Sequence, residues 1–102
     1  MDRVFRALAD PSRRRMLSRL AEGPSTVSAL AEPLDMALPS VMQHLDVLID
    51  AGLVDSQKVG RVRTISLVPG ALDPVGAWLA ATRTNAERQA DRLVAHLTEE
   101  SS

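Results

Sequence analysis

The segment spanning residues 37–67 constrains the fold more than any other part of the chain. In its first half an apolar residue recurs every three or four positions, which predicts an amphipathic helix that begins near Leu38 and ends at Gly52. Two runs that alternate apolar and polar side chains follow, Leu53–Val59 and Val62–Val68. The segment is therefore expected to form a helix followed by a two-stranded hairpin.

The expected helix has two different faces, because successive residues on a helix turn by about 100°. Its apolar face consists of Val41, Leu45, Leu48 and Ile49. The opposite face carries Ser40, Gln43 and His44, whose donors and acceptors are small enough to meet the edges of base pairs. Such a face is suited to reading a DNA groove. The solvent-exposed side of an ordinary amphipathic helix has the same pattern, so the pattern alone does not decide between the two.

The expected hairpin turns at Val59-Gly60-Arg61 and carries three cations, Lys58, Arg61 and Arg63. No acidic residue lies between Asp55 and Asp73. A cationic hairpin suits contact with phosphates or a minor groove. Charge on an edge hairpin also prevents aggregation, and that role alone would explain the pattern.

The rest of the sequence predicts four further helices. One covers about Asp2 to Leu8, and a second, capped by Asp10 with Pro11 at its first position, continues to about Ala21. A short third helix begins after Ser25 or Thr26, and a long one follows Asp73-Pro74. The predicted fold is mainly α with a small β-hairpin: a winged helix-turn-helix of about five helices and a two-stranded wing, forming one domain over residues 1–102.

Composition narrows the class of protein further. The chain has 102 residues, of which 45% are hydrophobic, and this size suits a single modest core that association would help to stabilise. It has no cysteine, which removes disulfides and thiolate metal sites. No run of eighteen apolar residues and no signal sequence is present, so a soluble, cytoplasmic protein without a membrane partner is expected. The net charge is −1, so the chain as a whole is not basic. A surface that attracts DNA would have to come from local groups of Lys and Arg.

Double-stranded DNA is the partner that this combination favours. The residues expected to contact DNA are Pro39, Ser40, Gln43, His44, Arg14, Lys58, Arg61 and Arg63. Gln43 can bridge N6 and N7 of adenine, but the reading helix has no Lys or Arg to contact guanine, so moderate, A·T-leaning specificity is expected. Arg13 is expected to pack its stem and pair its head with a carboxylate, which leaves the more exposed Arg14 as the candidate for phosphate contact.

The long final helix carries an apolar stripe that is longer than a domain of this size needs for its own core. The stripe consists of Val75, Leu79, Thr82, Ala86, Leu93 and Leu97. Trp78, the single tryptophan, is expected to anchor the core or an interface. His96 complements the negative end of the helix dipole, and its i, i+5 spacing from Asp91 does not favour a metal site.

Two other classes of function compete with DNA reading. A winged helix can serve as a protein-interaction module, and the absence of Lys and Arg from the reading helix supports that alternative. An enzyme is the weakest interpretation, because Ser40 and His44 are i, i+4 neighbours without an oriented carboxylate, a phosphate loop or a metal pair. No catalytic residue and no cofactor is expected.

Three segments resemble the ArsR/SmtB-type winged-helix repressors: ALADPSRRRMLSRLAEGPSTVSALAEPL, LPSVMQHLDVLIDAGLV and VGRVRTISL. The resemblance covers nearly the whole chain and implies a homodimer built from the first and last helices, which represses transcription at an operator and is released by an inducer. Metal-sensing members carry a cysteine pair in the third helix, where this chain has Thr26 and Ser28. It therefore resembles the metal-independent members, and the inducer is not identified.

On this resemblance the two terminal helices supply the dimer interface. The residues expected there are Val4, Phe5, Leu8, Val75, Trp78, Leu79, Leu93 and Leu97. Two reading helices related by a dyad would meet half-sites about one helical turn apart, roughly 10 to 11 bp, in a pseudo-palindromic operator.

Overall fold

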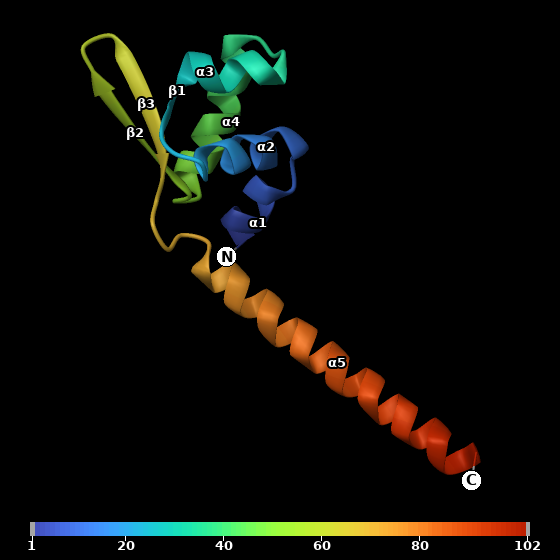
Figure 1. Cartoon of the computed structure of the whole chain (residues 1–102). Helices are drawn as coiled ribbons and strands as arrows, with labels where there is room; N and C mark the ends of the chain where they lie inside the picture. The colour runs from blue at the N-terminus through green and yellow to red at the C-terminus, as the bar shows by residue number, and fades with distance from the viewer. Residues whose placement is uncertain (1, 102) are drawn as a thin grey trace. The chain divides into compact units, whose positions relative to one another are not determined.

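The computed structural model describes residues 2–101, which divide into two compact units between Ala71 and Leu72 (Figure 1). The elements of the first unit are α1 (Asp2–Leu8), α2 (Pro11–Leu20), β1 (Ser25–Thr26), α3 (Val27–Ala31), the 3₁₀ helix η1 (Glu32–Leu34), α4 (Leu38–Asp50), β2 (Val54–Val59) and β3 (Val62–Leu67). The second unit contains α5 (Asp73–Ser101). The predicted winged helix-turn-helix is thus confirmed, with α3 and α4 as the helix pair and β2–β3 as the wing.

Side-chain caps fix the beginnings of α2 and α3. The Asp10 carboxylate accepts hydrogen bonds from the backbone N–H groups of Ser12 (2.8 Å) and Arg13 (3.1 Å), so the predicted cap is confirmed. At α3 the sequence left two candidates, and the structure selects Thr26, whose Oγ1 accepts from the N–H of Ala29 at 3.2 Å. Both caps satisfy amide groups that the helix itself cannot pair.

Gly52 ends α4 in a Schellman motif. Its N–H donates to the carbonyl of Ile49 (2.9 Å), and the N–H of Leu53 donates to the carbonyl of Leu48 (3.0 Å). Gly52 has φ of 75°, in the left-handed region that glycine occupies without strain. Leu48 and Leu53 are both buried, which supplies the apolar contact that usually accompanies this motif. The chain therefore turns sharply from α4 into β2.

The sheet has three antiparallel strands in the order β1-β3-β2, one more than the predicted wing. The extra strand is only two residues long and pairs Ser25 with Ile65 and Thr26 with Thr64. The β2–β3 register begins at the pair Val59–Val62, so the turn contains only two residues. Gly60 supplies the positive φ (63°) at the first of these two positions, as in a type II′ turn.

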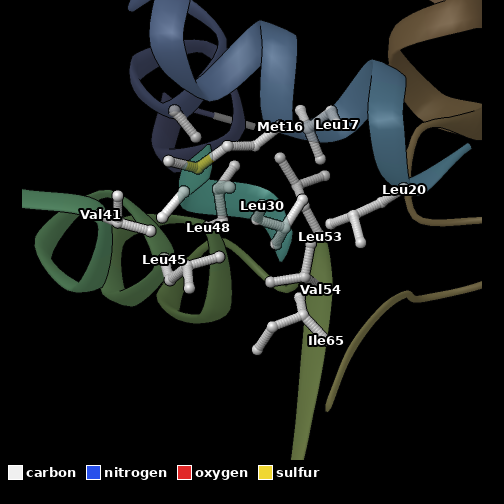
Figure 2. Close-up of a cluster of buried hydrophobic side chains, with 12 residues drawn as sticks. Met16, Leu17, Leu20, Leu30, Val41, Leu45, Leu48, Leu53, Val54 and Ile65 are labelled. Carbon is white, nitrogen blue, oxygen red and sulfur yellow. The ribbon is translucent and has the colours of Figure 1, made fainter. Parts of the chain in front are cut away.

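The core of the first unit lies among α2, α3, α4 and the sheet (Figure 2). Its largest fully buried side chains are Met16, Leu30, Leu45, Leu48, Leu53, Ile65, Val41 and Val54. Three of these come from the predicted apolar face of α4. Burying that face fixes the rotation of α4 and therefore decides which of its side chains reach solvent.

The second unit is a single helix of 29 residues, α5, which spans about 43 Å at 1.5 Å per residue. The predicted stripe occupies about 60° of the helix circumference at about 100° per residue. Leu79, Leu93 and Leu97 in this stripe are about half exposed (54%, 59% and 52%). Within residues 2–101, neither α5 nor any other helix has the length and apolar character needed to cross a membrane.

We predict that replacing Gly52 destabilises the protein according to how well the new residue tolerates a left-handed backbone. A Cβ at this position would meet no atom within 4 Å, so the cost comes from backbone conformation alone. Gly52→Ala should lose about 1–2 kcal/mol of unfolding free energy, and Gly52→Asn clearly less, because asparagine enters this region more readily. Urea unfolding would measure both; equal losses for Ala and Asn would contradict the explanation.

Candidate nucleic-acid interface

A groove of about 580 Å³ lies between the wing and the beginnings of α3 and α4. Its lining residues are Thr26, Val27, Ser28, Leu38, Met42, Lys58, Arg61, Val62 and Arg63. All three cations predicted on the wing belong to this lining, and no carboxylate does. The groove thus combines a strongly basic wall with hydroxyl groups from α3 and an apolar floor from α4.

The strand register brings two of these cations together. Lys58 and Arg63 are direct partners across the β2–β3 ladder, so their side chains leave the same face of the hairpin. Like charges in directly opposed positions destabilise a sheet. Both residues are exposed, and neither forms an ion pair within the described part of the chain. An anion bound at this face would remove the repulsion.

The exposed face of α4 differs from the predicted one by a rotation. Pro39 and Gln43 are exposed as expected, but Ser40 is half-buried and the His44 side chain is only 20% exposed. Val47 and the acidic Asp46 and Asp50 complete the exposed side instead. The reason is the helical angle: at about 100° per residue, His44 lies only about 65° from the centre of the buried face formed by Val41, Leu45 and Leu48, so it borders that face instead of opposing it.

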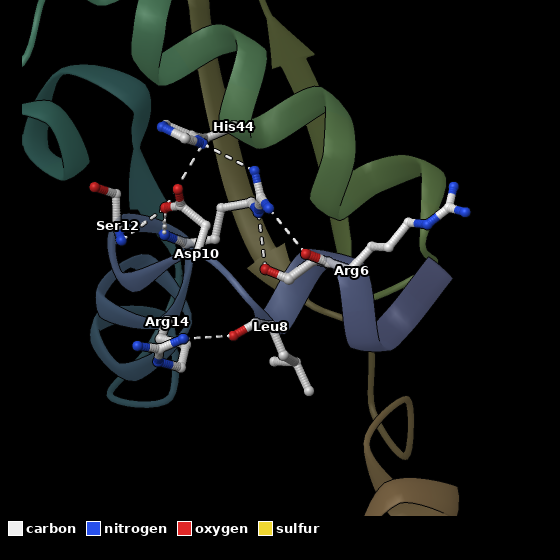
Figure 3. A network of polar contacts seen from close by, with 8 residues as sticks. Arg6, Leu8, Asp10, Ser12, Arg14 and His44 are labelled. Carbon is white, nitrogen blue, oxygen red and sulfur yellow. Dashed lines mark hydrogen bonds and ion pairs between the residues drawn. The ribbon is translucent and has the colours of Figure 1, made fainter. Parts of the chain in front are cut away.

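His44 contacts the beginning of α2 (Figure 3). Its Nδ1 lies 3.2 Å from NH1 of Arg13 and 3.9 Å from Oδ1 of Asp10. A single polar cluster therefore connects the reading helix to the cap of α2. The prediction that His44 faces open solvent is wrong in this respect, whereas its predicted contact with DNA remains a prediction.

Arg13 and Arg14 close the carbonyl end of α1. Arg13 donates from Nε to the carbonyl of Ala7 (2.8 Å) and from NH2 to that of Arg6 (2.8 Å), and Arg14 donates from NH1 to that of Leu8 (2.7 Å). The expectation that Arg13 pairs with a carboxylate is thus corrected, because unpaired helix carbonyls lie within reach of its guanidinium. Arg14 is exposed, but its guanidinium already donates to the carbonyl of Leu8, so a phosphate would have to share this side chain with α1.

The pKa of Asp10 lies below its ordinary value of 3.8. Desolvation by its surroundings raises the pKa, but the opposing contributions are together larger. They come from the hydrogen bond donated by the N–H of Arg13, the electrostatic interaction with His44, the hydrogen bond donated by the N–H of Ser12, and the charge of Arg13. The carboxylate is therefore stabilised in its charged form at the point where α1, α2 and α4 meet.

Six of the residues lining the groove were not among the contact residues expected from the sequence: Thr26, Val27, Ser28, Leu38, Met42 and Val62. Thr26 and Ser28 are exposed hydroxyl residues, and Thr26 already accepts from Ala29, which leaves its own O–H to donate elsewhere. The sequence signal that could have indicated Thr26 and Ser28 is their position at the start of a predicted short helix. Only the fold shows that this helix start faces the wing.

The residues expected at the dimer interface fall into two groups. Val4 and Leu8 of α1 are partly buried and pack against the core of their own unit, and Val75 is buried. Phe5 (38%), Trp78 (48%) and the three leucines of the α5 stripe are exposed to a greater degree. Among the side chains described, those of residues 2–98, no cluster of three or more His, Asp or Glu could hold a metal ion.

The chain is similar in sequence to a helix-turn-helix domain family and to curated regulators of transcription. A helix-turn-helix domain family matches residues 8–57. The chain is 45% identical over 87 residues to the HTH-type transcriptional regulator Rv2034 of Mycobacterium tuberculosis, covering 85% of this chain and 75% of that protein. It is 32% identical over 79 residues to the transcriptional repressor SdpR of Bacillus subtilis, covering 78% and 88% of the two chains.

Solved structures give the same fold. The crystal structure of an ArsR family transcriptional regulator is similar with a TM-score of 0.77 and 49% identity, covering 84% of this chain and 89% of the other. The homodimeric winged helix-turn-helix domain of Mb0332 from Mycobacterium bovis, solved in solution, has a TM-score of 0.63 at 27% identity and covers 89% and 82% of the two chains.

We predict that the Asp10 carboxylate stabilises the folded protein at neutral pH and loses this effect in acid. Because its folded-state pKa is lowered, the stabilisation is fully present above the ordinary value of 3.8 and disappears as the pH falls through the folded-state value. Asp10→Asn preserves a capping side chain, so its difference from wild type should be largest between pH 5 and 7 and shrink below about pH 4.

Asp10→Ala provides the comparison, since it should cost about 0.5–2 kcal/mol through loss of the cap itself. Urea unfolding of the three proteins at a series of pH values measures both effects. An Asn variant that differs from wild type equally at pH 3 and pH 7 would show that the charge of Asp10 is not involved.

Proposed function

The chain belongs to the ArsR family of winged helix-turn-helix transcriptional regulators, and we propose that it acts as a homodimeric repressor at a pseudo-palindromic operator. DNA binding and transcription regulation follow from the family. We propose in addition that the chain represses transcription, that it forms a homodimer, and that the residues named below contact DNA. Its place of action is the cytoplasm, where a regulator of this family meets its DNA.

The observation that carries the proposal is the basic wall of the groove beside α4. Lys58 and Arg63 repel each other across the ladder, and Arg61 adds a third cation in the adjoining turn. A phosphate backbone along this wall would turn a destabilising arrangement into a favourable one. The hydroxyl groups of Thr26 and Ser28, which also line the groove, would complete the contacts to one strand.

In this arrangement the first turns of α4 enter the major groove. Pro39 and Gln43 are exposed there, and Ser40 is half-buried beside them. Gln43 is the side chain that can make a bidentate contact with adenine. The acidic Asp46 and Asp50 lie toward the C-terminal end of α4, where they would stay away from the phosphates. Moderate base specificity supported by backbone contacts is the expected mode of binding.

The α5 helix supplies the second half of the proposal. Its stripe exposes leucines at positions 79, 93 and 97 in one line, as expected of a helix that packs against a second copy. The similar domain of Mb0332 is homodimeric. A dimer would present two α4 helices about one helical turn of DNA apart.

We predict that the wing cations determine affinity through phosphates. If about four to six phosphates are neutralised per dimer, log K plotted against log salt should have a slope of about −4 to −5. Arg61→Glu and Arg63→Glu should each weaken binding at least about tenfold, or about 1.4 kcal/mol, and make this slope shallower.

Arg88→Glu is the matched control, because it makes the same charge change on α5, across that helix from the apolar stripe. Fluorescence anisotropy with a duplex selected by the protein, over a salt series, measures both quantities. A salt-independent affinity, or equal losses for Arg61→Glu and Arg88→Glu, would contradict the assignment of the wing to DNA.

We predict that one charge in the α5 stripe separates the dimer. Wild type should sediment at about 22 kDa, twice the 11.0 kDa of one chain. Leu93→Glu should shift the population toward monomer, because it places a carboxylate among apolar side chains. Thr84→Glu adds the same charge on the other side of α5 and should leave the dimer intact. A monomeric wild-type protein would refute this part of the proposal.

A further inference from the structure

The hydrogen bond between Arg13 and His44 fixes where the proton of the imidazole lies. A guanidinium group has donors and no acceptor, so NH1 of Arg13, 3.2 Å from Nδ1, must donate to it. Nδ1 can accept only when it carries no proton. The neutral His44 ring is therefore protonated on Nε2.

Asp10 does not favour the opposite tautomer. Its Oδ1 is 3.9 Å from Nδ1, which is too long for a hydrogen bond, and the same oxygen already accepts from two backbone N–H groups. Asp10 and Arg13 are the charged groups that the structure places against the ring. Of the two, only Arg13 is within hydrogen-bonding distance.

Arg13 is itself held in place by α1. Its Nε and NH2 donate at 2.8 Å to the carbonyls of Ala7 and Arg6, so the planar guanidinium is fixed by three contacts including that to His44. Arg13 is half-buried, which limits competition from water. A side chain held in this way is a positioning residue, and the group that it positions is an imidazole on the reading helix.

Nε2 lies on the side of the ring away from Asp10 (Figure 3). His44 follows Ser40 by one turn of α4 and is next to the exposed Gln43. Since side chains on a helix lean toward its N-terminus, the ring lies over the part of α4 that meets DNA in the proposed function. Part of its surface remains accessible, as 20% of the side chain is exposed.

We propose that His44 is a specificity-determining residue that Arg13 holds as an obligate donor, with Nε2–H donating to an acceptor atom of the duplex. This inference rests on the proposed DNA-binding function. The eligible partners are purine N7, guanine O6, thymine O4 and a phosphate oxygen. The amino groups of adenine N6 and cytosine N4 are excluded, because they too are donors. A ring that is protonated on both nitrogens still donates from Nε2, so the exclusion does not depend on pH.

The tautomer is tested first in the free protein. Long-range ¹H–¹⁵N correlation spectra of wild type should show Nε2 protonated and Nδ1 bare in the neutral ring of His44. In Arg13→Lys, which keeps the charge but loses the planar fork, the Nδ1 signal should move toward a mixture of tautomers. A neutral wild-type ring protonated on Nδ1 overturns the proposal without reference to DNA.

The contact with DNA is tested by deleting one atom at a time from a duplex that the protein has selected from random sequence. Suitable analogues are 7-deazapurines for N7, 2-aminopurine for guanine O6, 5-methyl-2-pyrimidinone for thymine O4 and methylphosphonates for the backbone. One deletion should weaken wild-type binding about tenfold and have no effect on His44→Asn, which retains an acceptor for Arg13 but has no donor at the Nε2 position. The type of analogue that shows this coupling distinguishes a base edge from a phosphate.

His44→Gln is the conservative variant, since its amide N–H₂ reaches the position of Nε2, and it should recover most of the affinity lost in His44→Asn. Circular dichroism confirms that both variants are folded. Coupling to deletion of adenine N6, or no coupling at any acceptor while wild type binds its duplex, overturns this inference alone. Failure of wild type to select any duplex overturns the proposed function together with it.

Discussion

The burial of one side of α4 is the constraint on which the rest of this structure depends. Val41, Leu45 and Leu48 are completely buried in the core that α4 forms with α1, α2, α3 and the sheet, and a helix held by three such residues has no freedom to rotate. The same contacts that contribute most to folding therefore decide which groups of α4 face outward. One side of α4 belongs to the core and the other side is exposed. A change in the packing of the core would therefore rotate α4 and change which of its side chains are exposed.

Features that depend on neighbouring residues could be predicted from the sequence. The cap at Asp10, the glycine end of α4 and the hairpin turn between Val59 and Val62 follow from local geometry, and the structure has all three. The strand β1 could not be predicted, because two residues carry no detectable period and their pairing partner lies about 40 positions away in the sequence. Likewise, the groove could not be predicted, because its lining residues come from segments that are separated in the sequence and meet only in the folded chain.

The arginines at the start of α2 show a different limit of sequence reasoning. Positive charge near a helix N-terminus is unfavourable, and from the sequence we expected a carboxylate to pair with Arg13 and a phosphate to contact Arg14. The structure instead provides internal compensation, because Arg13 and Arg14 bond to carbonyls at the end of the preceding helix, where the dipole is negative. Which acceptor a long side chain chooses depends on the path of the backbone between two helices. That path is not encoded in charge pattern.

The short strand β1 has a mechanical consequence. Thr26 pairs with Thr64 in the sheet and, through its hydroxyl, holds the first turn of α3. No linker separates the two roles, since a single residue performs both. A displacement of β3 is therefore passed through Thr26 to the first turn of α3. In the proposed complex with DNA, the wing and the start of α3 would move together.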